Sequence, residues 1–306
     1  MDIDSFATHS CRLRSNSFQT AKANGDILGM CRSMDITFDF YIPVISILRE
    51  RDIAYIIAPY EADAQLSFLS RNGLVDFIIA TDGDMLPYGC DRLFYRMNND
   101  GIGRYIERSK VFKSKEIGLT EFTEDMFLFM CILAKCDYLN NIPRVGIKTA
   151  IEAVRVGKTI DAIFAHLQQR FTLPEGYREG FQKALHTFRY QVVFDPVRER
   201  QVFLQPPPPS LDLSTHSYLG RIEKDEERAV ELAQGVRNPK TGEIIADDWR
   251  GKETRSYAIA RAVKRNGNGL LPFFSRHKRV GCIVKDDRGK RGKKEHGKDG
   301  AGFPMG

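Results

Sequence analysis

The chain of 306 residues is 42% hydrophobic and 28% charged, a composition typical of a globular protein with a hydrophobic core. No stretch has the roughly 18 consecutive apolar residues that a membrane-spanning helix needs, and the first residues contain no apolar signal-peptide segment, which argues against secretion. The net charge of +6 lies in residues 276–306, which hold ten Lys and Arg against four Asp and Glu. Such a basic tail is typical either of nucleic-acid or import-receptor binding or of a solvated, disordered segment.

The six cysteines have no C-x-x-C spacing and form no Cys/His cluster of the kind that binds zinc. Cys131 and Cys136 stand in an apolar stretch and are predicted to be buried thiols. This usage favours a reducing compartment.

The first regular pattern is a helix over 44–51 followed by a strand over 54–58. Apolar residues at helical spacing then predict a helix over 61–73, with Gly73 as its C-terminal stop. The continuous apolar run 75–80 is typical of a strand buried on both faces of a parallel sheet. Strand, helix and strand within about thirty residues predict a βαβ unit.

A hairpin is predicted next, over 91–111, with its turn at 99–101. From Thr123, a plausible N-cap, the pattern becomes helical, and the first of these helices is apolar almost all round, so it should be buried. Further helices follow up to the polyproline stretch 205–210, and one more lies at 223–235.

The pattern as a whole predicts three regions. They are an α/β region (1–118), a helical region (119–235) and a basic, largely disordered tail (236–306).

Four acidic residues stand where two apolar runs end: Glu61 and Asp63 after the first, Asp82 and Asp84 after the second. Because ligands of open α/β sheets bind at the carboxyl ends of the strands, these carboxylates should meet at one edge. Oxygen ligands without His or Cys favour Mg²⁺ or Mn²⁺, and two such ions about 4 Å apart are a common device for phosphodiester hydrolysis.

A structural interpretation of the same acids stays open. An E-x-D after a proline is also a helix-start signal, and D-G-D is also a turn. On a regular helix Glu61 and Asp63 would point roughly 200° apart. Both can face one metal site only if the pair lies at the cap or first turn, or if one acts through water.

A fifth acid, Asp137, ends the buried helix, and the sequence after it has the form of a helix-hairpin-helix. Hairpins of this kind bind the DNA backbone through N–H groups of the turn and of the second helix, without reading sequence. Arg144 and Lys148 stand where they would add phosphate contacts.

The segments "APYEADAQLSFL", "IIATDGDMLPYGC", "FLFMCILAKCDYLNNIPRVGIKTA" and "FRYQVVFDP" together resemble the XPG/flap-endonuclease family of 5′ nucleases, over residues 33–235. The spelling P-Y-E-A-D-A-Q resembles the exonuclease branch, since flap endonucleases usually have G-E-A-E-A there.

The resemblance implies a parallel-sheet, PIN-like α/β nuclease core, of which residues 1–118 are a part, with an all-α helix-hairpin-helix DNA-binding region in residues 119–235. It also implies a Mg²⁺-dependent 5′→3′ double-stranded DNA exonuclease and 5′-flap endonuclease, acting by a two-metal mechanism in mismatch repair and recombination in the nucleus. The catalytic and metal-binding residues would be Glu61, Asp63, Asp82, Asp84 and Asp137. The hairpin, Ile142–Thr149 with Arg144, Gly146, Lys148 and Thr149, would hold a K⁺ ion and the duplex backbone.

Of three departures from the family, one is Ala80-Thr81-Asp82 in place of the usual Thr-Glu-Asp, and the other two bear on activity and on the hairpin. Members have two earlier strands that each end in a metal-binding aspartate, and this sequence begins after both, as a gene-model truncation or a short protein would. A chain with that start is expected to be weakly active or inactive, so a catalytically inactive DNA-binding remnant is the alternative. The hairpin also has Arg144 where the family has Gly, which strains the turn if that position needs a positive φ.

The tail suggests partners. Leu270, Phe273 and Phe274 resemble a peptide that binds the sliding clamp PCNA, without its defining Gln, and "KDDRGKRGKK" is typical of a nuclear-import signal. The expected partners are duplex or flap DNA, PCNA and mismatch-repair proteins, with no membrane, and the protein is expected to be a monomer.

Overall fold

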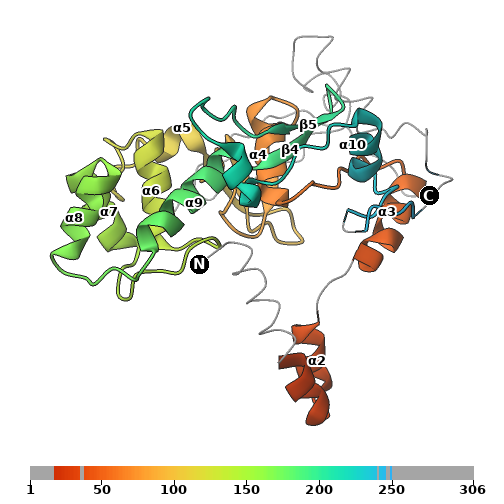
Figure 1. The fold of residues 1–306 in the computed structure, drawn as a ribbon, viewed down its shortest axis with the longest axis horizontal. Coiled ribbons are helices and arrows are strands. Elements are labelled where there is room, and N and C mark those ends of the chain that lie inside the picture. The colour runs from red at the N-terminus through yellow and green to blue at the C-terminus, as the bar shows by residue number, and fades with distance from the viewer. Residues whose placement is uncertain (1–16, 35–37, 240, 246–248, 250–306) are drawn as a thin grey trace, which may run out of the picture.

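The computed structural model describes residues 17–34, 38–239, 241–245 and 249. In Figure 1 a group of helices occupies one end of the molecule, a small sheet lies behind its centre, and α3 and α10 lie at the other end. The predicted clamp-binding peptide and import signal, and most of the basic tail, fall outside the described residues.

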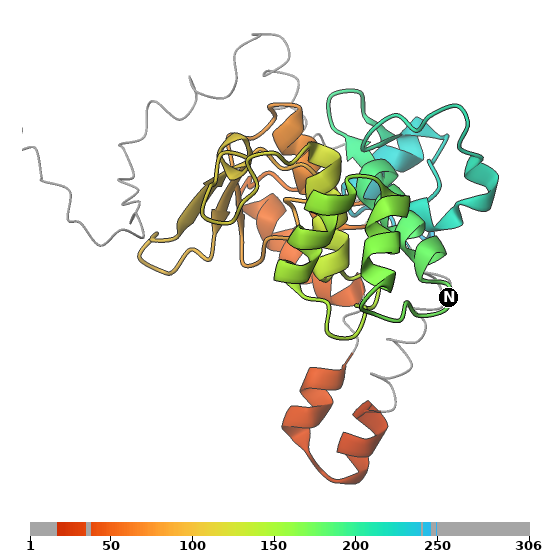
Figure 2. The ribbon, with the colours of Figure 1, turned by 90° about the vertical axis from the view of Figure 1, so that its left-hand side faces the viewer.

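The first part of the described chain contains a mixed sheet of three short strands. β1 (Ile78–Ala80) pairs in parallel with β2 (Arg92–Tyr95), which pairs antiparallel with β3 (Arg104–Glu107). Figure 2 shows these strands beside the helical part. The β2–β3 hairpin confirms the predicted hairpin, and Gly101, with φ of +74°, allows its tight turn.

The predicted strand at 54–58 is wrong, and the βαβ unit built on it is wrong as well. The segment has no regular secondary structure, and Ile57 N–H donates to the Ala233 carbonyl at 2.9 Å. A strand forms only with a neighbouring ladder, and here the neighbour is a helix end. The prediction that β1 is buried on both faces is also wrong, since Ile78 is 3% exposed and Ile79 is 50% exposed. The sheet is therefore small and only partly parallel.

Two helices flank the irregular segment. They are α3 (Tyr41–Glu50), which follows the 3₁₀ turn η1 (Phe38–Phe40), and α4 (Ala62–Arg71). Both were predicted, and Gly73 ends the second with φ of +65°, as expected of a C-terminal glycine. Before them, α2 (Ile27–Ser33) projects away from the remaining fold in both views.

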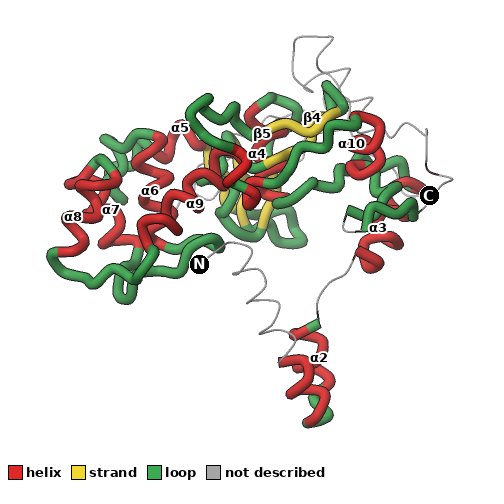
Figure 3. Tube along the Cα trace, in the orientation of Figure 1, coloured by secondary structure: helices red, strands yellow, loops and turns green. Residues whose placement is uncertain are grey.

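The largest hydrophobic core lies among the five helices that follow the three-stranded sheet. These are α5 (Arg108–Val111), α6 (Glu124–Ala134), α7 (Ile147–Gly157), α8 (Ile160–Gln168) and α9 (Tyr177–Tyr190). The Thr123 side chain accepts a bond from Met126 N–H at 3.2 Å, which confirms the predicted N-cap of α6. Helix α6 is buried on nearly every side, also as predicted, and its neighbours pack around it (Figure 3). Cys131 and Cys136, predicted to be buried, are only partly so.

A two-stranded antiparallel sheet connects this core to the end of the described chain. It consists of β4 (Val192–Asp195) and β5 (Arg200–Phe203), followed by η2 (Leu213–Thr215), η3 (Ser217–Leu219) and α10 (Glu226–Ala233). Within the described residues, no helix is both long and apolar enough to cross a membrane.

Candidate metal centre and DNA-binding hairpin

Helix α4 presents its two acids from its very start. Glu61 is the N-cap, with extended φ and ψ of −78° and 127°, and Asp63 lies in the first turn. The Glu61 side chain makes no capping bond. The regular-helix angle of about 200° between the two side chains therefore does not apply, because one of the pair stands outside the helix.

Asp82 and Asp84 follow the carboxyl end of β1, as predicted. The Asp84 N–H donates to Asp82 Oδ1 at 3.4 Å, so this D-G-D segment is a turn. It is at the same time part of a cluster, since one carboxylate oxygen from each of Asp63, Asp82 and Asp84 lies within 4.8 Å of the others. Turn and cluster are thus compatible, although the sequence presented them as alternatives.

The crowding perturbs the acids. Burial, and then the negative charges of Asp82 and Asp84, raise the pKa of Asp63 from its ordinary value of 3.8 to about 6. Burial followed by Asp82 also raises the pKa of Asp84, against which Lys135 acts in the opposite direction. Like charges this close oppose ionisation unless a cation neutralises them.

Glu61 and Asp137 lie within electrostatic reach of this cluster. Burial and then Asp137 raise the pKa of Glu61, and both residues contribute to the raised pKa of Asp63. The structure thus brings all five predicted acids into one neighbourhood, with Asp63, Asp82 and Asp84 as its compact centre among the described residues.

A buried aromatic group supports the acids, and sequence analysis did not identify it. The hydroxyls of Tyr88 and Tyr138 hydrogen-bond to each other. Both rings contact Phe188 edge-on, with distances between ring centroids of 4.8 Å for Tyr88 and 5.1 Å for Tyr138. Tyr138 directly follows Asp137, and Tyr88 lies in the same β1–β2 loop as Asp82 and Asp84. The pair therefore joins two acid-bearing segments, which no local pattern could reveal because they are 50 residues apart.

Helix α4 is also tied directly to the loop that carries Asp82 and Asp84. Ser67, fully buried, donates from Oγ to the Met85 carbonyl at 3.2 Å. Asp63 and Ser67 are four residues apart and so share one face of the helix. Because Met85 directly follows Asp84, this hydrogen bond holds the Asp63 face of α4 next to the loop that contains Asp84.

The donor set fits a hard divalent cation. It consists of carboxylate oxygens alone, and the cluster spans a distance that one ion can bridge. Mg²⁺ or Mn²⁺ would be held by Asp63, Asp82 and Asp84, with Glu61 and Asp137 as further oxygen donors nearby.

The hairpin before α7 is a tight turn with strain at one residue. Val145 N–H donates to the Ile142 carbonyl at 3.0 Å across Pro143 and Arg144. Arg144 has φ of +67°, whereas Gly146 has φ of −116°. Proline followed by a positive φ is the type II arrangement, which favours Gly at the second central position. The predicted strain at Arg144 is therefore present.

The same turn exposes groups suited to an anionic backbone. Arg144, Gly146 and Lys148 are exposed, and Thr149 is half-buried. The N-cap of α7 is Gly146, which has no side chain to cap the first N–H groups at the positive end of the helix dipole. Asn141 fixes the hairpin by donating from Nδ2 to the Ala134 carbonyl of α6 at 2.5 Å.

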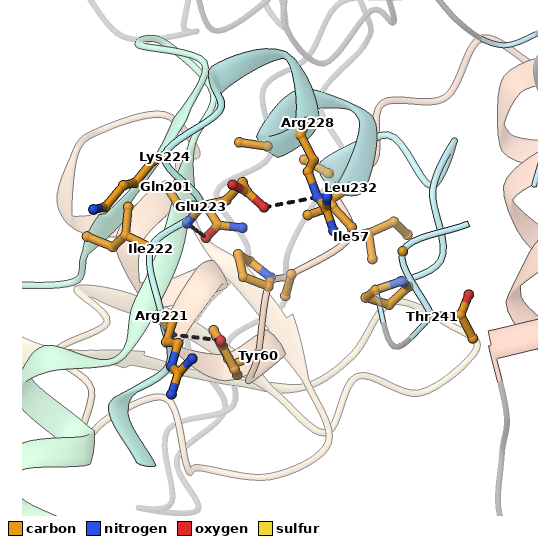
Figure 4. A pocket seen from close by; sticks show the side chains of 16 residues that line it. Ile57, Tyr60, Gln201, Arg221, Ile222, Glu223, Lys224, Arg228, Leu232 and Thr241 are labelled. Atoms are coloured by element: carbon orange, nitrogen blue, oxygen red, sulfur yellow. Dashed lines mark hydrogen bonds and ion pairs between the residues drawn. The ribbon is translucent and has the colours of Figure 1, made fainter. Parts of the chain in front are cut away.

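A pocket of about 510 Å³ borders the segment that leads into Glu61. Its lining includes three cations, Arg221, Lys224 and Arg228 (Figure 4). Arg228 pairs with Glu223 at 3.0 Å, and the Tyr60 hydroxyl accepts from Arg221 N–H at 2.9 Å. The pocket wall therefore includes the residue that directly precedes the first acid.

Comparison with known proteins finds several sequence relatives and a family model that covers the five acidic residues. Residues 52–137 match the XPG I-region. The chain is 36% identical over 222 residues to exonuclease 1 of Danio rerio, covering 71% of this chain and 27% of that protein. It is 39% identical over 232 residues to exonuclease 1 of Oryza sativa subsp. japonica, covering 75% of this chain and 27% of that protein. The chain thus spans little more than a quarter of the length of these curated relatives.

Solved structures overlap with the chain only in part. Flap endonuclease-1 from Methanococcus jannaschii gives a TM-score of 0.41 at 18% identity, over 76% of this chain and 60% of that one. Kinship therefore rests on the sequence relatives.

Proposed function

Since this chain is a homologue of exonuclease 1 in the XPG/flap-endonuclease family of 5′ nucleases, we propose that it hydrolyses DNA phosphodiesters. The activity is Mg²⁺-dependent 5′→3′ exonuclease and 5′-flap endonuclease action. The observation that carries the proposal is the convergence of Asp63, Asp82 and Asp84 within 4.8 Å. Such crowding costs free energy in a protein that binds no cation.

In this proposal the carboxylates hold the catalytic cation. A bound Mg²⁺ supplies Lewis-acid stabilisation of the charge that develops on the phosphodiester oxygens. Asp63 has a pKa of about 6 without metal, so it releases its proton at neutral pH and becomes an ionised ligand. Glu61 and Asp137 extend the oxygen-lined surface, and the full proposed catalytic set is Glu61, Asp63, Asp82, Asp84 and Asp137.

The hairpin is proposed to hold the duplex. Backbone N–H groups at the start of α7, with the exposed side chains of Arg144 and Lys148, contact phosphates without reading sequence. Gly146 and Thr149 complete this surface, and the K⁺ ion expected from the family resemblance belongs to the same turn. Because Asp137 and the hairpin are joined by only a few residues, binding there brings the backbone towards the acids.

The carboxylate cluster favours a nuclease over the alternative of an inactive DNA-binding remnant. DNA is a polyanion, so crowded carboxylates would lower the DNA affinity of a surface whose function was binding alone. A cation between acids and phosphate reverses that repulsion. The same acids that oppose passive binding are therefore suited to metal-dependent cleavage.

The biological setting is proposed by the same kinship. It comprises mismatch repair and recombination in the nucleus, with mismatch-repair proteins and PCNA as partners.

The test is to incubate the full chain with 5′-labelled flap and blunt duplex DNA, with Mg²⁺ and with EDTA. Cleavage is expected with Mg²⁺ alone, and Asp82→Ala should abolish it. Glu116→Gln, at an exposed acid away from the cluster, is the matched control and should cut normally. Binding without cleavage by the wild-type chain would favour the inactive remnant, and full activity of Asp82→Ala would refute the metal assignment.

A further inference from the structure

The motif that supplies Glu61 and Asp63 contains two polar residues with no part in the proposed chemistry. They are Tyr60, directly before Glu61, and Gln65, two residues after Asp63. Each makes a contact to a segment more than a hundred residues away along the chain. Both contacts lie within one helical turn or so of the acids, and each end of the acid-bearing segment is therefore anchored.

Gln65 makes the more complete contact. Its amide Nε2 donates to the Phe194 carbonyl at 2.8 Å, and its Oε1 accepts from Phe194 N–H at 2.7 Å. Gln65 is 3% exposed and Phe194 is fully buried. The side-chain amide therefore satisfies both backbone groups of Phe194, as a peptide group of a neighbouring strand would.

This contact determines how α4 is oriented. Phe194 belongs to β4, which pairs with β5 on one side and receives Gln65 in place of a further strand. Each helical residue advances about 100°, so Asp63 projects roughly opposite to Gln65. A helix held against β4 through Gln65 consequently directs Asp63 away from β4, to the side where Ser67 of the same helix bonds the Met85 carbonyl beside Asp84.

Tyr60 anchors the other end. Its hydroxyl accepts from Arg221 N–H, as the dashed line in Figure 4 marks. Its ring lies against the backbone of Gly220, where an added Cβ would be 2.3 Å from the ring. Gly220 has φ of +89°, so both its dihedral and the ring favour glycine. The extended backbone of Glu61 thus begins from a fixed point.

We propose that Gln65, assisted by Tyr60, is a positioning residue for the metal centre. It touches neither cation nor substrate, and it sets the place of Glu61 and Asp63 relative to Asp82 and Asp84. This inference rests on the proposed function, because the geometry matters only if the acids hold a cation. Loss of a residue that orients metal ligands without contacting the metal typically lowers metal affinity by about 10- to 100-fold.

The test measures Mn²⁺ binding to the full chain by EPR titration, at a temperature where every variant is folded. Gln65→Met keeps the side-chain volume and removes both hydrogen bonds. We expect it to weaken Mn²⁺ affinity by about tenfold or more and to raise the Mg²⁺ concentration for half-maximal cleavage, with kcat recovered at saturating Mg²⁺. Tyr60→Phe keeps the ring on Gly220 and should show a smaller change in the same direction.

Asn72→Ala is the matched control. Asn72 donates to the Phe68 carbonyl at the opposite end of α4 at 2.8 Å, so its loss weakens the same helix far from the acids. We expect a lower Tm with unchanged Mn²⁺ affinity. If Gln65→Met fails to fold, Tyr60→Phe decides the inference alone, since its side chain is half exposed.

The possible failures are distinct. If the wild type binds Mn²⁺ and Tyr60→Phe and any folded Gln65→Met bind it with the same affinity, the positioning role is overturned. The proposed nuclease function is not affected by that result. Absence of Mn²⁺ binding by the wild-type chain at millimolar concentration would overturn the metal-dependent function, and the positioning role with it.

Discussion

The acid cluster and the hairpin turn both hold unfavourable energy, but of different kinds. Around Asp63 the cost is electrostatic, because burial and four other carboxylates oppose its ionisation. At Arg144 the cost is conformational, because a residue with a side chain has φ of +67°. A bound cation offsets the first cost, because its charge neutralises the crowded carboxylates. A bound phosphate cannot relieve the second, since it leaves the backbone dihedral unchanged.

The difference has a consequence for ligand linkage. When strain at a site disappears on ligand binding, the relief of strain adds to the ligand affinity. The free energy of unfolding of the protein then depends on the ligand concentration. A site whose strain persists has the same cost when free and when bound. The predictions below, from the largest expected effect to the smallest, test whether the two regions differ in this way.

Asp63→Asn should have opposite effects on metal affinity and on stability. The neutral amide removes a proposed ligand, so Mn²⁺ affinity should fall by more than the roughly 10- to 100-fold typical of an outer residue. The same change removes the most strongly perturbed carboxylate, so the metal-free Tm at pH 7.5 should rise. Titration and differential scanning fluorimetry on one preparation check both, and a lower metal-free Tm would contradict the electrostatic strain.

The free energy of unfolding of the metal-free protein should depend on pH in the way that the raised pKa of Asp63 dictates. Its folded pKa of about 6 exceeds the ordinary value of 3.8, so the folded state binds the proton more tightly. That contribution is fully present below about pH 4 and is lost as the pH rises to about 6. Glu61 and Asp84, whose pKa values are also raised, act in the same direction.

The measurement is the difference in Tm between wild type and Asp63→Asn from pH 4 to pH 8. We expect the wild type to lose stability relative to the variant as the pH increases, and Mg²⁺ to restore it only above about pH 6. A difference that stays constant with pH, or Mg²⁺ stabilisation that is as large at pH 4 as at pH 7.5, would count against a crowded, cation-dependent cluster.

Arg144→Gly should stabilise the fold and weaken DNA binding together. Glycine adopts the positive φ freely, which should add about 1 kcal/mol to the free energy of unfolding. Loss of the guanidinium removes a phosphate contact, so duplex affinity should fall several-fold at low salt. Urea denaturation and fluorescence anisotropy with a labelled duplex measure the two quantities.

Lys158→Gly provides the matched control at the other end of α7. Lys158 has φ of +61° at the C-cap, so relief of strain should again stabilise the protein. It lies away from the hairpin, so DNA affinity should stay within error of wild type. Equal loss of affinity in both variants would show that Arg144 has no particular role in the hairpin.

Lys148→Ala tests the smallest effect, a single exposed charge at the start of α7. The slope of log affinity against log salt concentration should decrease by about 1, with little change in Tm. Lys113→Ala, at a lysine outside the hairpin, should leave the slope unchanged. An unaltered slope in Lys148→Ala would remove this residue from the DNA interface.

Local sequence signals predicted much of the fold and the acids of the candidate centre. Thr123 as an N-cap, Gly73 as a helix stop and the β2–β3 hairpin depend on neighbouring residues, and all three are present. The positions of the acids after β1 and at the start of α4 are local in the same sense. Such features were accessible because their energies arise within a few residues.

The contacts that assemble the centre were decided by the tertiary structure. Residues 54–58 have the composition of a strand, yet they lie against the end of α10 and form no ladder. Tyr88 meets Tyr138, and Gln65 meets Phe194, across 50 and 129 residues of chain. These pairings depend on which partner the folded chain brings near, and no periodicity within either segment contains that information.

The sequence alone therefore determined which carboxylates are present and in what order they follow the apolar segments. Only the tertiary structure decided that Asp63, Asp82 and Asp84 form the compact centre and that Arg144, not Gly146, has the positive φ. The physical reason is common to both. Ligand chemistry belongs to the residue type, whereas distance and backbone dihedral are set by the packing of segments far apart in the chain.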